Sequence, residues 1–180
     1  MRIQRFLAAM VLCTVLLVLL HTALTYTERE RYPKGYEGEV MYFSELYGVP
    51  APIVFAVIKV ESDFDPHAVS TAGAKGLMQL TDTTFEWIRS KIGTDTDHVF
   101  DPTTNIRYGV YYLSYLYHHF EDWRIAFAAY NAGPNRVDGW LREDGELQAI
   151  PFKETREYLG RVCAAVKKYE KLYDLRRIKP

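Results

Sequence analysis

One carboxylic acid, Glu61, extends an apolar face of a predicted helix. It follows Val57 by four positions and Ile53 by eight, so a helix would place all three side chains on one side. The pair Asp65-Pro66 lies just beyond, and the residue before a proline avoids helical backbone angles. The spacing therefore predicts that this glutamate lies in the last turn of a helix and faces inward.

Such a position would raise the pKa of Glu61. Burial disfavours the charged form of a carboxyl group, and the C-terminal end of a helix carries partial negative charge. A carboxyl that stays protonated near neutral pH can protonate the leaving oxygen in glycosidic bond cleavage. Taken alone, an inward-facing Glu more often caps a helix or pairs with a Lys or Arg, so the chemical interpretation depends on the neighbouring motifs.

A glycine-containing stretch follows this glutamate at residues 70–79, STAGAKGLMQ. Its two glycines, Gly73 and Gly76, indicate backbone that approaches another group closely. The stretch is either a tight loop packed on the preceding helix or one wall of a groove. In a groove, Ser70 and Gln79 would offer hydrogen bonds to the polar substituents of a sugar.

Two later segments combine polar side chains with helix ends. Residues 128–134, AAYNAGP, run from an apolar helix into Gly and Pro, and Asn131 there needs hydrogen-bond partners. Tyr130 beside it also fits an ordinary core position. Residues 150–158, IPFKETREY, begin another helix, in whose first turn the helix dipole favours Glu154. Each segment alone has a structural explanation.

The elements that must position these groups are predicted to be helices. Apolar residues recur at helical spacing, and the alternation typical of strands is nearly absent, so the predicted fold class is all-α without a substantial sheet. The stretch from Trp123 to Tyr130 is apolar nearly all round and predicts a central buried helix. The other predicted apolar faces comprise Ile53, Ala56, Val57 and Val60; Ile106, Val110, Leu113, Leu116 and Phe120; and Leu159, Val162, Val166, Tyr169 and Tyr173.

A capping box is predicted at Thr83 and Glu86, opening a helix that carries Trp87 and Ile88. Cys163 falls on the apolar face of the last helix and is predicted to be a small core residue.

The first segment differs in composition from the rest. Arg2 and Arg5 precede a charge-free stretch from Phe6 to about Leu24, which is long enough to cross a bilayer as a helix. Basic residues before it favour a cytoplasmic N-terminus and an extracytoplasmic body. A cleaved signal peptide is the alternative, although a small-x-small cleavage site is hard to find. The predicted domains are a cytoplasmic tip and membrane anchor at 1–26, a polar stalk at 27–38 and a catalytic domain at 39–176.

Charge and cysteine usage narrow the functional classes. The formal net charge is -1, which gives no basic excess for a nucleic-acid partner. Cys13 lies in the apolar first segment and the second cysteine in the body, so we predict no disulfide between them. Nothing in the sequence indicates a metal site.

Taken together, the motifs resemble those of the soluble lytic transglycosylase family. The resemblance runs from about residue 42 to residue 173, and its motifs occur in the family's order and spacing. One departure is Asp82, where the family usually has proline; we expect it to alter the start of that helix and not the chemistry. The matching motifs are ES-x-F-x-P-x-A-x-S-x-x-GA-x-GLMQ from Glu61 onward, Asn105-Ile106 with Gly109, AYNAGP at 129–134 and PF-x-ETR-x-Y at 151–158.

The resemblance implies a lysozyme-like helical catalytic domain related to goose-type lysozymes. Glu61 matches the family's single catalytic acid. Tyr130 matches a tyrosine that approaches the catalytic carboxyl group, and Glu154 matches a supporting acidic residue. The full set of implied substrate-binding residues is Ser70, Met78, Gln79, Tyr130, Asn131 and Glu154.

The implied activity is cleavage of the β-1,4 bond between N-acetylmuramic acid and N-acetylglucosamine in peptidoglycan. The product would be a 1,6-anhydromuramic end, formed with one Glu as acid and then base and with no cofactor or metal. The expected partners are glycan strands and, through the N-terminal helix, the membrane, with the catalytic domain outside the cytoplasm. A lysozyme-type hydrolase, a chitin-cleaving relative and a non-catalytic cell-wall-binding protein are the alternatives.

Overall fold

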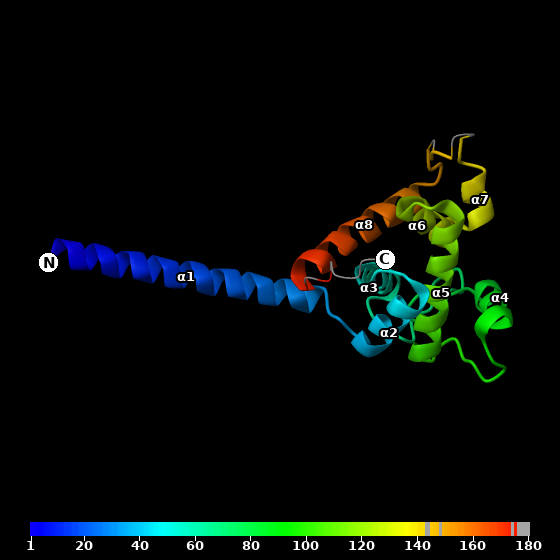
Figure 1. Ribbon diagram of the computed structural model, residues 1–180, viewed down its shortest axis with the longest axis horizontal. Coiled ribbons are helices and arrows are strands. Elements are labelled where there is room, and N and C mark those ends of the chain that lie inside the picture. The colour runs from blue at the N-terminus through cyan, green and yellow to red at the C-terminus, as the bar shows by residue number, and fades with distance from the viewer. Residues whose placement is uncertain (143–144, 148, 174, 176–180) are drawn as a thin grey trace. The chain divides into compact units, whose positions relative to one another are not determined.

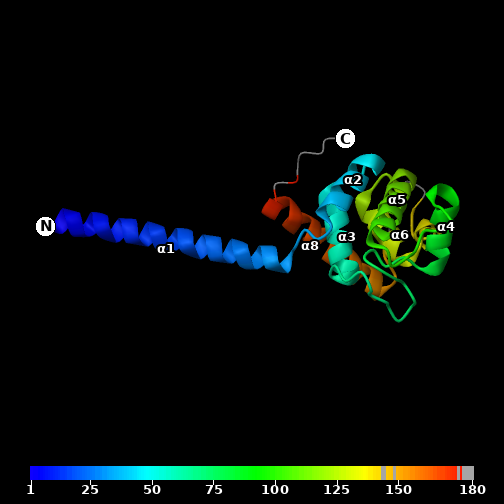
Figure 2. The same ribbon diagram turned by 90° about the horizontal axis from the view of Figure 1, so that it is seen from below.

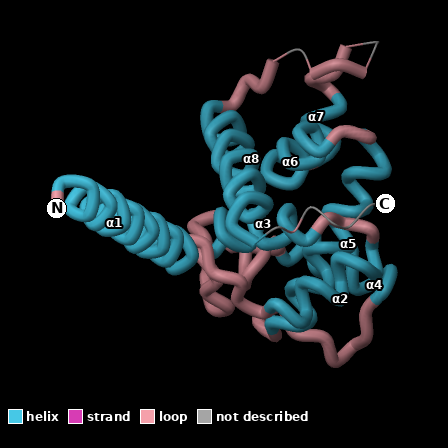
Figure 3. Tube along the Cα trace, turned by 60° about the vertical axis from the view of Figure 1, so that its left-hand side comes forward, coloured by secondary structure: helices cyan, strands magenta, loops and turns pink. Residues whose placement is uncertain are grey.

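The computed structural model describes residues 1–142, 145–147, 149–173 and 175 (Figure 1). The predicted all-α class is confirmed, because these residues form helices, turns and loops, and the β-contacts among them are isolated bridges (Figure 3). The chain divides into two units, Met1–Pro33 and Lys34–Pro180. In chain order the helices are α1 (Arg2–Arg31), α2 (Glu37–Tyr47), α3 (Ala51–Ser62), α4 (Asp82–Ile92), α5 (Pro102–Phe120), α6 (Trp123–Ala132), α7 (Pro134–Asp138) and α8 (Lys153–Tyr173).

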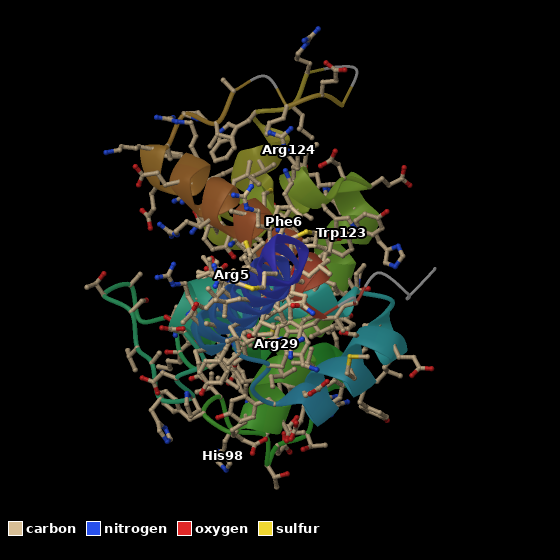
Figure 4. The ribbon with its side chains drawn as sticks, turned by 90° about the vertical axis from the view of Figure 1, so that its left-hand side faces the viewer. Arg5, Phe6, Arg29, His98, Trp123 and Arg124 are labelled. Atoms are coloured by element: carbon tan, nitrogen blue, oxygen red, sulfur yellow. The ribbon has the colours of Figure 1, made fainter. Side chains whose placement is uncertain are left out.

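The first unit is built on α1, whose apolar side chains are exposed. Arg5 and Phe6 lie in its first part and Arg29 in its last turn (Figure 4). Its length and composition suit a membrane-spanning helix, and a signal sequence would meet the same criteria. The helix continues to Arg31, so the first residues of the predicted stalk at 27–38 are helical.

The second unit is organised around α3. Every residue from Ala51 to Ile58 is buried, so the buried surface is wider than the predicted stripe, whereas Val60 is only partly buried. Helix α8 runs beside α3 (Figures 1 and 2), and the rings of Phe55 and Tyr169 stack with their centroids 5.4 Å apart. Burial on several sides explains why α3 is apolar nearly all round.

Helix α5 connects the remaining helices of this unit, because it packs against α2, α4 and α6. Proline at its first position and Asp101 at its N-cap favour its start, since the Asp101 side chain accepts a hydrogen bond from the backbone N–H of Thr104. Asp122 caps α6 in the same way through the N–H groups of Arg124 and Ile125. The predicted central helix at 123–130 is confirmed, with Ile125 to Ala129 buried.

Two smaller predictions are wrong. Helix α4 begins two residues earlier than the predicted capping box, because Thr81 is its N-cap and accepts from the N–H of Thr84, while Thr83 lies inside the helix. Cys163 is only partly buried and lines a cavity bounded by α8, the start of α6 and residues that precede α8.

The loop between α3 and α4 is anchored on α5 by Asn105, which is buried. The side-chain amide donates to the carbonyl oxygens of Lys75 (3.1 Å) and Val99 (2.7 Å), and its oxygen accepts from the N–H of Met78 at 2.8 Å. Gly76 has a φ of +77°, and a Cβ there would overlap the Asn105 side chain. The predicted close approach is therefore an approach of Gly76 to α5, whereas a Cβ on Gly73 would meet nothing within 4 Å.

Gly109 lets Met78 reach α5, and replacing Gly109 by alanine should destabilise the domain. The new Cβ would overlap the Met78 side chain, which is fully buried and has no room to move away. Overpacking of this kind costs about 1–3 kcal/mol. The control is Gly160→Ala on α8, where a Cβ meets open space and the higher helix propensity of alanine should stabilise by up to about 1 kcal/mol. Urea unfolding compares them; equal stability of the two variants would refute close packing at Gly109.

Candidate active site

Glu61 lies in the last turn of α3, as predicted, and its side chain is partly buried. The helix ends just beyond, because Asp63 and Phe64 both adopt left-handed backbone angles, with φ of 53° and 66°. The hydroxyl of Tyr158 on α8 donates a hydrogen bond to Oε1 of Glu61 at 2.7 Å. The site is therefore assembled where α3 and α8 pack together.

Burial raises the pKa of Glu61 from 4.5 to about 7. Two neighbours oppose this effect and lower the pKa: the Tyr158 hydroxyl, which donates to the carboxyl group, and the positive charge of Arg161. Near neutral pH the protonated and charged forms are thus similarly populated. A group with this pKa can give up a proton and take one back in a single reaction cycle.

Two tyrosines surround this carboxyl group. The hydroxyl of Tyr130 on α6 donates to the backbone carbonyl of Met78 at 2.7 Å, while that of Tyr158 donates to Glu61. Burial and the nearby charge of Glu61 raise the pKa of both tyrosines well above the ordinary value, so both hydroxyls stay protonated. The direct hydrogen bond to the glutamate therefore comes from Tyr158 and not from Tyr130, for which the resemblance implied the approach.

The loop that follows α3 carries Ser70 and Gln79, both partly buried. The Ser70 hydroxyl accepts from the N–H of Ala74 at 3.0 Å and closes a tight turn. The Gln79 side-chain amide donates to the carbonyls of Ala68 (3.1 Å) and Gly76 (2.8 Å), which fixes its direction. Its amide oxygen accepts no hydrogen bond from the residues that the structure describes and is available to a ligand.

Met78 lies in the same loop, but its side chain is fully buried against α5. Its contribution to the site comes through its backbone carbonyl, which holds the Tyr130 hydroxyl. A second tie between the loop and α3 is the hydroxyl of Ser62, which donates to the carbonyl of Leu77 at 2.8 Å. These bonds set the position of the loop relative to Glu61.

Asn131 and Glu154 lie at the ends of two other helices. Asn131 is in the last turn of α6, partly buried, and its side-chain amide forms no hydrogen bond with any described residue. Glu154 is exposed in the first turn of α8, one turn before Tyr158 on the same face. Neither side chain contacts Glu61 directly through a hydrogen bond.

The carboxylates nearest to Glu61 in sequence interact with groups other than Glu61. Asp63 is exposed and pairs with Lys59, and Asp65 accepts from the N–H of His67 at 2.9 Å in a turn. Within the described ranges, no group of three or more His, Cys, Asp or Glu residues is placed to hold a metal ion. The site therefore offers one acid, without a second carboxylate from these turn positions.

An aromatic cavity of about 330 Å³ lies next to this site, between α4, α5 and the start of α7. Its wall includes Trp87, Tyr112 and Tyr115, whose rings lie within 6.3 Å of one another between centroids. The Tyr112 ring also lies 5.4 Å from that of Tyr130, which connects the cavity to the surroundings of Glu61.

Three residues of the site were not assigned from the sequence. Tyr158 and Asn105 both occur within the quoted motifs, but nothing local shows that one contacts Glu61 and the other holds the loop. Arg161 lies one turn after Tyr158 and acts on Glu61 through its charge. The helical spacing of Glu154, Tyr158 and Arg161 on one face of α8 is the signal that could have indicated Tyr158 and Arg161.

The fold and the site define a lysozyme-like, all-α domain with one glutamate at the end of a buried helix. This chain belongs to the transglycosylase SLT domain family, whose family model matches residues 41–153. It is 34% identical over 147 residues to the soluble lytic murein transglycosylase of Escherichia coli K12, an alignment that covers 75% of this chain and 23% of that protein. It is 33% identical to membrane-bound lytic murein transglycosylase C of Shigella sonnei, over 76% of this chain and 46% of the relative.

Solved structures show the same likeness. An inactive glutamate-to-glutamine mutant of lytic transglycosylase Slt from Pseudomonas aeruginosa matches with a TM-score of 0.74 and 33% identity, over 82% of this chain and 26% of that one. The soluble lytic transglycosylase in complex with bulgecin A matches with a TM-score of 0.72 and 31% identity, over 80% of this chain and 25% of that one. This chain thus spans about a quarter of the soluble relatives and just under half of the membrane-bound one.

Proposed function

We propose that this chain is a peptidoglycan lytic transglycosylase in which Glu61 serves first as acid and then as base. The observation that carries the proposal is the partly buried carboxyl group with a pKa of about 7, placed beside two protonated tyrosines. One group with this pKa can perform both proton transfers near neutral pH. The adjoining aromatic cavity offers apolar faces and hydroxyls to sugar rings.

The reaction begins with protonation of the glycosidic oxygen. Glu61 donates its proton to the oxygen between N-acetylmuramic acid and N-acetylglucosamine, and the bond from that oxygen to the anomeric carbon breaks. The acetamido carbonyl of the muramic acid stabilises the positive anomeric carbon. The charged Glu61 then takes the proton of the C6 hydroxyl, whose oxygen bonds to the anomeric carbon and closes the 1,6-anhydro ring. No water is consumed, and Glu61 regains its proton.

The other residues position the carboxyl group or the strand. Tyr158 orients Oε1 of Glu61 and stabilises the charged form between the two proton transfers. The free amide oxygen of Gln79 and the amide of Asn131 are the groups that we assign to the acetamido and hydroxyl substituents of the glycan. Ser70 shapes the loop, Tyr130 and Met78 brace the site, and Glu154 supports the entrance to the groove.

Known relatives support this assignment. The names of the matching proteins specify murein as substrate, and the Pseudomonas structure is of a variant inactivated by a glutamate-to-glutamine change. The resemblance to a membrane-bound enzyme, with the apolar α1, also supports membrane association. We propose a single-pass anchor with the catalytic unit outside the cytoplasm, which protease protection in spheroplasts would test.

Mass spectrometry of muropeptides released from purified sacculi tests the reaction type. A transglycosylase yields anhydromuropeptides, which are one water lighter than the corresponding hydrolysis products. Exclusive release of reducing ends would identify a lysozyme-type hydrolase, in which water attacks in place of the C6 hydroxyl. Cleavage of chitin oligomers in preference to sacculi would identify a chitin-cleaving enzyme, and binding of sacculi without any cleavage would identify a wall-binding protein.

Tyr158→Phe is expected to move the alkaline limb of the pH–rate profile to higher pH. The Tyr158 hydroxyl lowers the pKa of Glu61 by donating a hydrogen bond to it, so removing that hydroxyl should raise the pKa and let Glu61 hold its proton to higher pH. The rate of cleavage of soluble glycan strands is measured from pH 5 to pH 9, with Tyr130→Phe as the control, because that hydroxyl is bonded to Met78. An unmoved limb in Tyr158→Phe, or the same movement in both variants, would contradict the role of Tyr158.

A further inference from the structure

Residues 34–36, which we call the entry segment, lie against the turn that ends α3. They are the first residues of the second unit and lead directly into α2. A Cβ added to Gly35 would come within 2.8 Å of Cδ1 of Phe64, so the glycine lets the backbone lie directly on the edge of that ring. Phe64 follows Glu61 by three positions. The entry segment therefore contacts the end of the helix that carries the proposed catalytic acid.

Contacts on both sides of its glycine hold the entry segment in place. The ammonium group of Lys34 donates to Glu37 and lies 5.0 Å from the centroid of the Tyr173 ring in the last turn of α8. On the other side, Tyr36 is the N-cap of α2 and has a left-handed φ of 56°. The entry segment thus connects α2 and the end of α8 to the turn after α3.

The turn that this segment contacts has an unfavourable backbone conformation. Asp63 and Phe64 are consecutive, and both have left-handed angles although neither is glycine. Such angles disfavour residues that carry a Cβ and persist where surrounding contacts hold them. The Asp63 side chain is exposed and pairs with Lys59 of the same helix. The ring of Phe64 instead packs on Gly35, so the contact that holds the second left-handed residue comes from the entry segment.

The conformation of this turn determines where the Glu61 carboxyl group lies. Glu61 is in the last turn of α3, where its Oε1 accepts from Tyr158 at 2.7 Å and its side chain is partly buried. Terminal turns of helices fray unless contacts beyond the helix hold them. Fraying here would admit water to the carboxyl group and separate it from Tyr158. A contact that fixes Phe64 therefore also fixes Glu61.

We propose that the entry segment positions the Glu61 carboxyl group for proton transfer through the ring of Phe64. Phe64 is then a positioning residue, which acts on the catalytic acid by holding the end of α3. Its part in cleavage rests on the proposed function, in which Glu61 is that acid. The entry segment precedes residues 41–153, which match the family model, so the active-site scaffold of this chain extends beyond the matched residues.

Gly35→Ala in the full chain, purified in detergent, tests the proposal. The new Cβ should displace the ring, so kcat on soluble glycan strands should fall at least about tenfold while KM changes by less than about twofold. The carbon-13 titration of Glu61 should move to lower pH, because loss of burial is the larger effect on its pKa. The matched control is Gly38→Ala, where a Cβ meets nothing within 4 Å and both measurements should stay unchanged.

A double-mutant cycle shows whether Gly35 acts through the ring. Phe64→Ala removes the ring and should lower kcat and move the Glu61 titration as Gly35→Ala does. Adding Gly35→Ala to Phe64→Ala should then cause no further loss of kcat, because nothing is left to displace. A further loss of the same size would overturn the proposal. Melting curves establish folding; if Gly35→Ala is unfolded, Lys34→Gln loosens the same segment without overlap and should shift both measurements in the same direction, and no shift would overturn the proposal.

The titration separates this proposal from the proposed function, because it needs no substrate. If no form of the chain cleaves glycan strands while the Glu61 titration moves in Gly35→Ala and not in Gly38→Ala, the proposed enzyme activity fails and the positioning stands. If the wild type cleaves and Gly35→Ala cleaves and titrates like it, the positioning alone is refuted. Lower thermal stability of Gly35→Ala with unchanged kcat and an unchanged titration would likewise refute it, since the contact would then serve only the fold.

Discussion

Glu61→Gln is expected to reduce glycan cleavage about a thousandfold or more without unfolding the protein. The amide has nearly the shape of the acid and its oxygen can still accept from Tyr158, but it has no proton to donate and does not act as a base. A positioned general acid contributes about 10²–10⁴-fold, and here one group would perform both proton transfers. The measurement is kcat/KM on soluble glycan strands near neutral pH, with binding of the strands measured separately and expected to be retained.

The matched control is Glu154→Gln, which makes the same chemical change on an exposed side chain without a hydrogen bond to Glu61. Its effect should be far smaller and should appear mainly in KM, as for a residue that supports strand binding. A comparable loss of activity in both variants would show that Glu61 has no special role. Full activity of Glu61→Gln would show that Glu61 is not the catalytic acid.

Glu61→Gln is also expected to stabilise the fold at high pH. The pKa of Glu61 is about 7 in the folded chain and 4.5 in a solvated one, so folding opposes its ionisation. Below pH 4.5 the group is protonated in both states and the wild type has its full stability. As the pH rises through 7, that stability is lost, by up to about 3 kcal/mol at about 1.4 kcal/mol per pKa unit.

Glutamine does not titrate. The free energy of unfolding of Glu61→Gln, relative to that of the wild type, should therefore rise by up to about 3 kcal/mol between pH 4 and pH 8. Urea unfolding at pH 4, 6 and 8 gives the difference at each pH. Glu154→Gln should show no comparable trend, since its side chain is exposed. A constant difference between Glu61→Gln and the wild type across this range would mean that the carboxyl group is not held out of water.

The sequence predicts the helices well where local signals agree. Helices α3, α5, α6 and α8 combine apolar periodicity with proline or aspartate at their starts, and these signals depend only on neighbouring residues. Helix α2 was not separately predicted, because its N-cap, Tyr36, has left-handed angles and gives no side-chain cap. The start of α4 was misplaced because Thr81, Thr83 and Thr84 all have capping chemistry, and only the backbone decides among them.

The candidate site was predictable only in part, because local sequence signals do not show which distant segments come into contact. Glu61 follows from the spacing along its own helix. Its partner Tyr158 is 97 positions away, and the packing of α3 against α8 that joins them leaves no local pattern. Met78 matches the motif in sequence, but its side chain packs against Gly109 in the core, and the motif alone does not show this burial.

Carbon-13 NMR titration of labelled glutamate carboxyl groups measures the pKa of Glu61, on which the proposed mechanism depends. The resonance of Glu61 is the one that disappears in Glu61→Gln. We predict that this resonance titrates near pH 7 and that its titration moves to still higher pH in Tyr158→Phe. A titration near pH 4.5, as for a solvated glutamate, would contradict it.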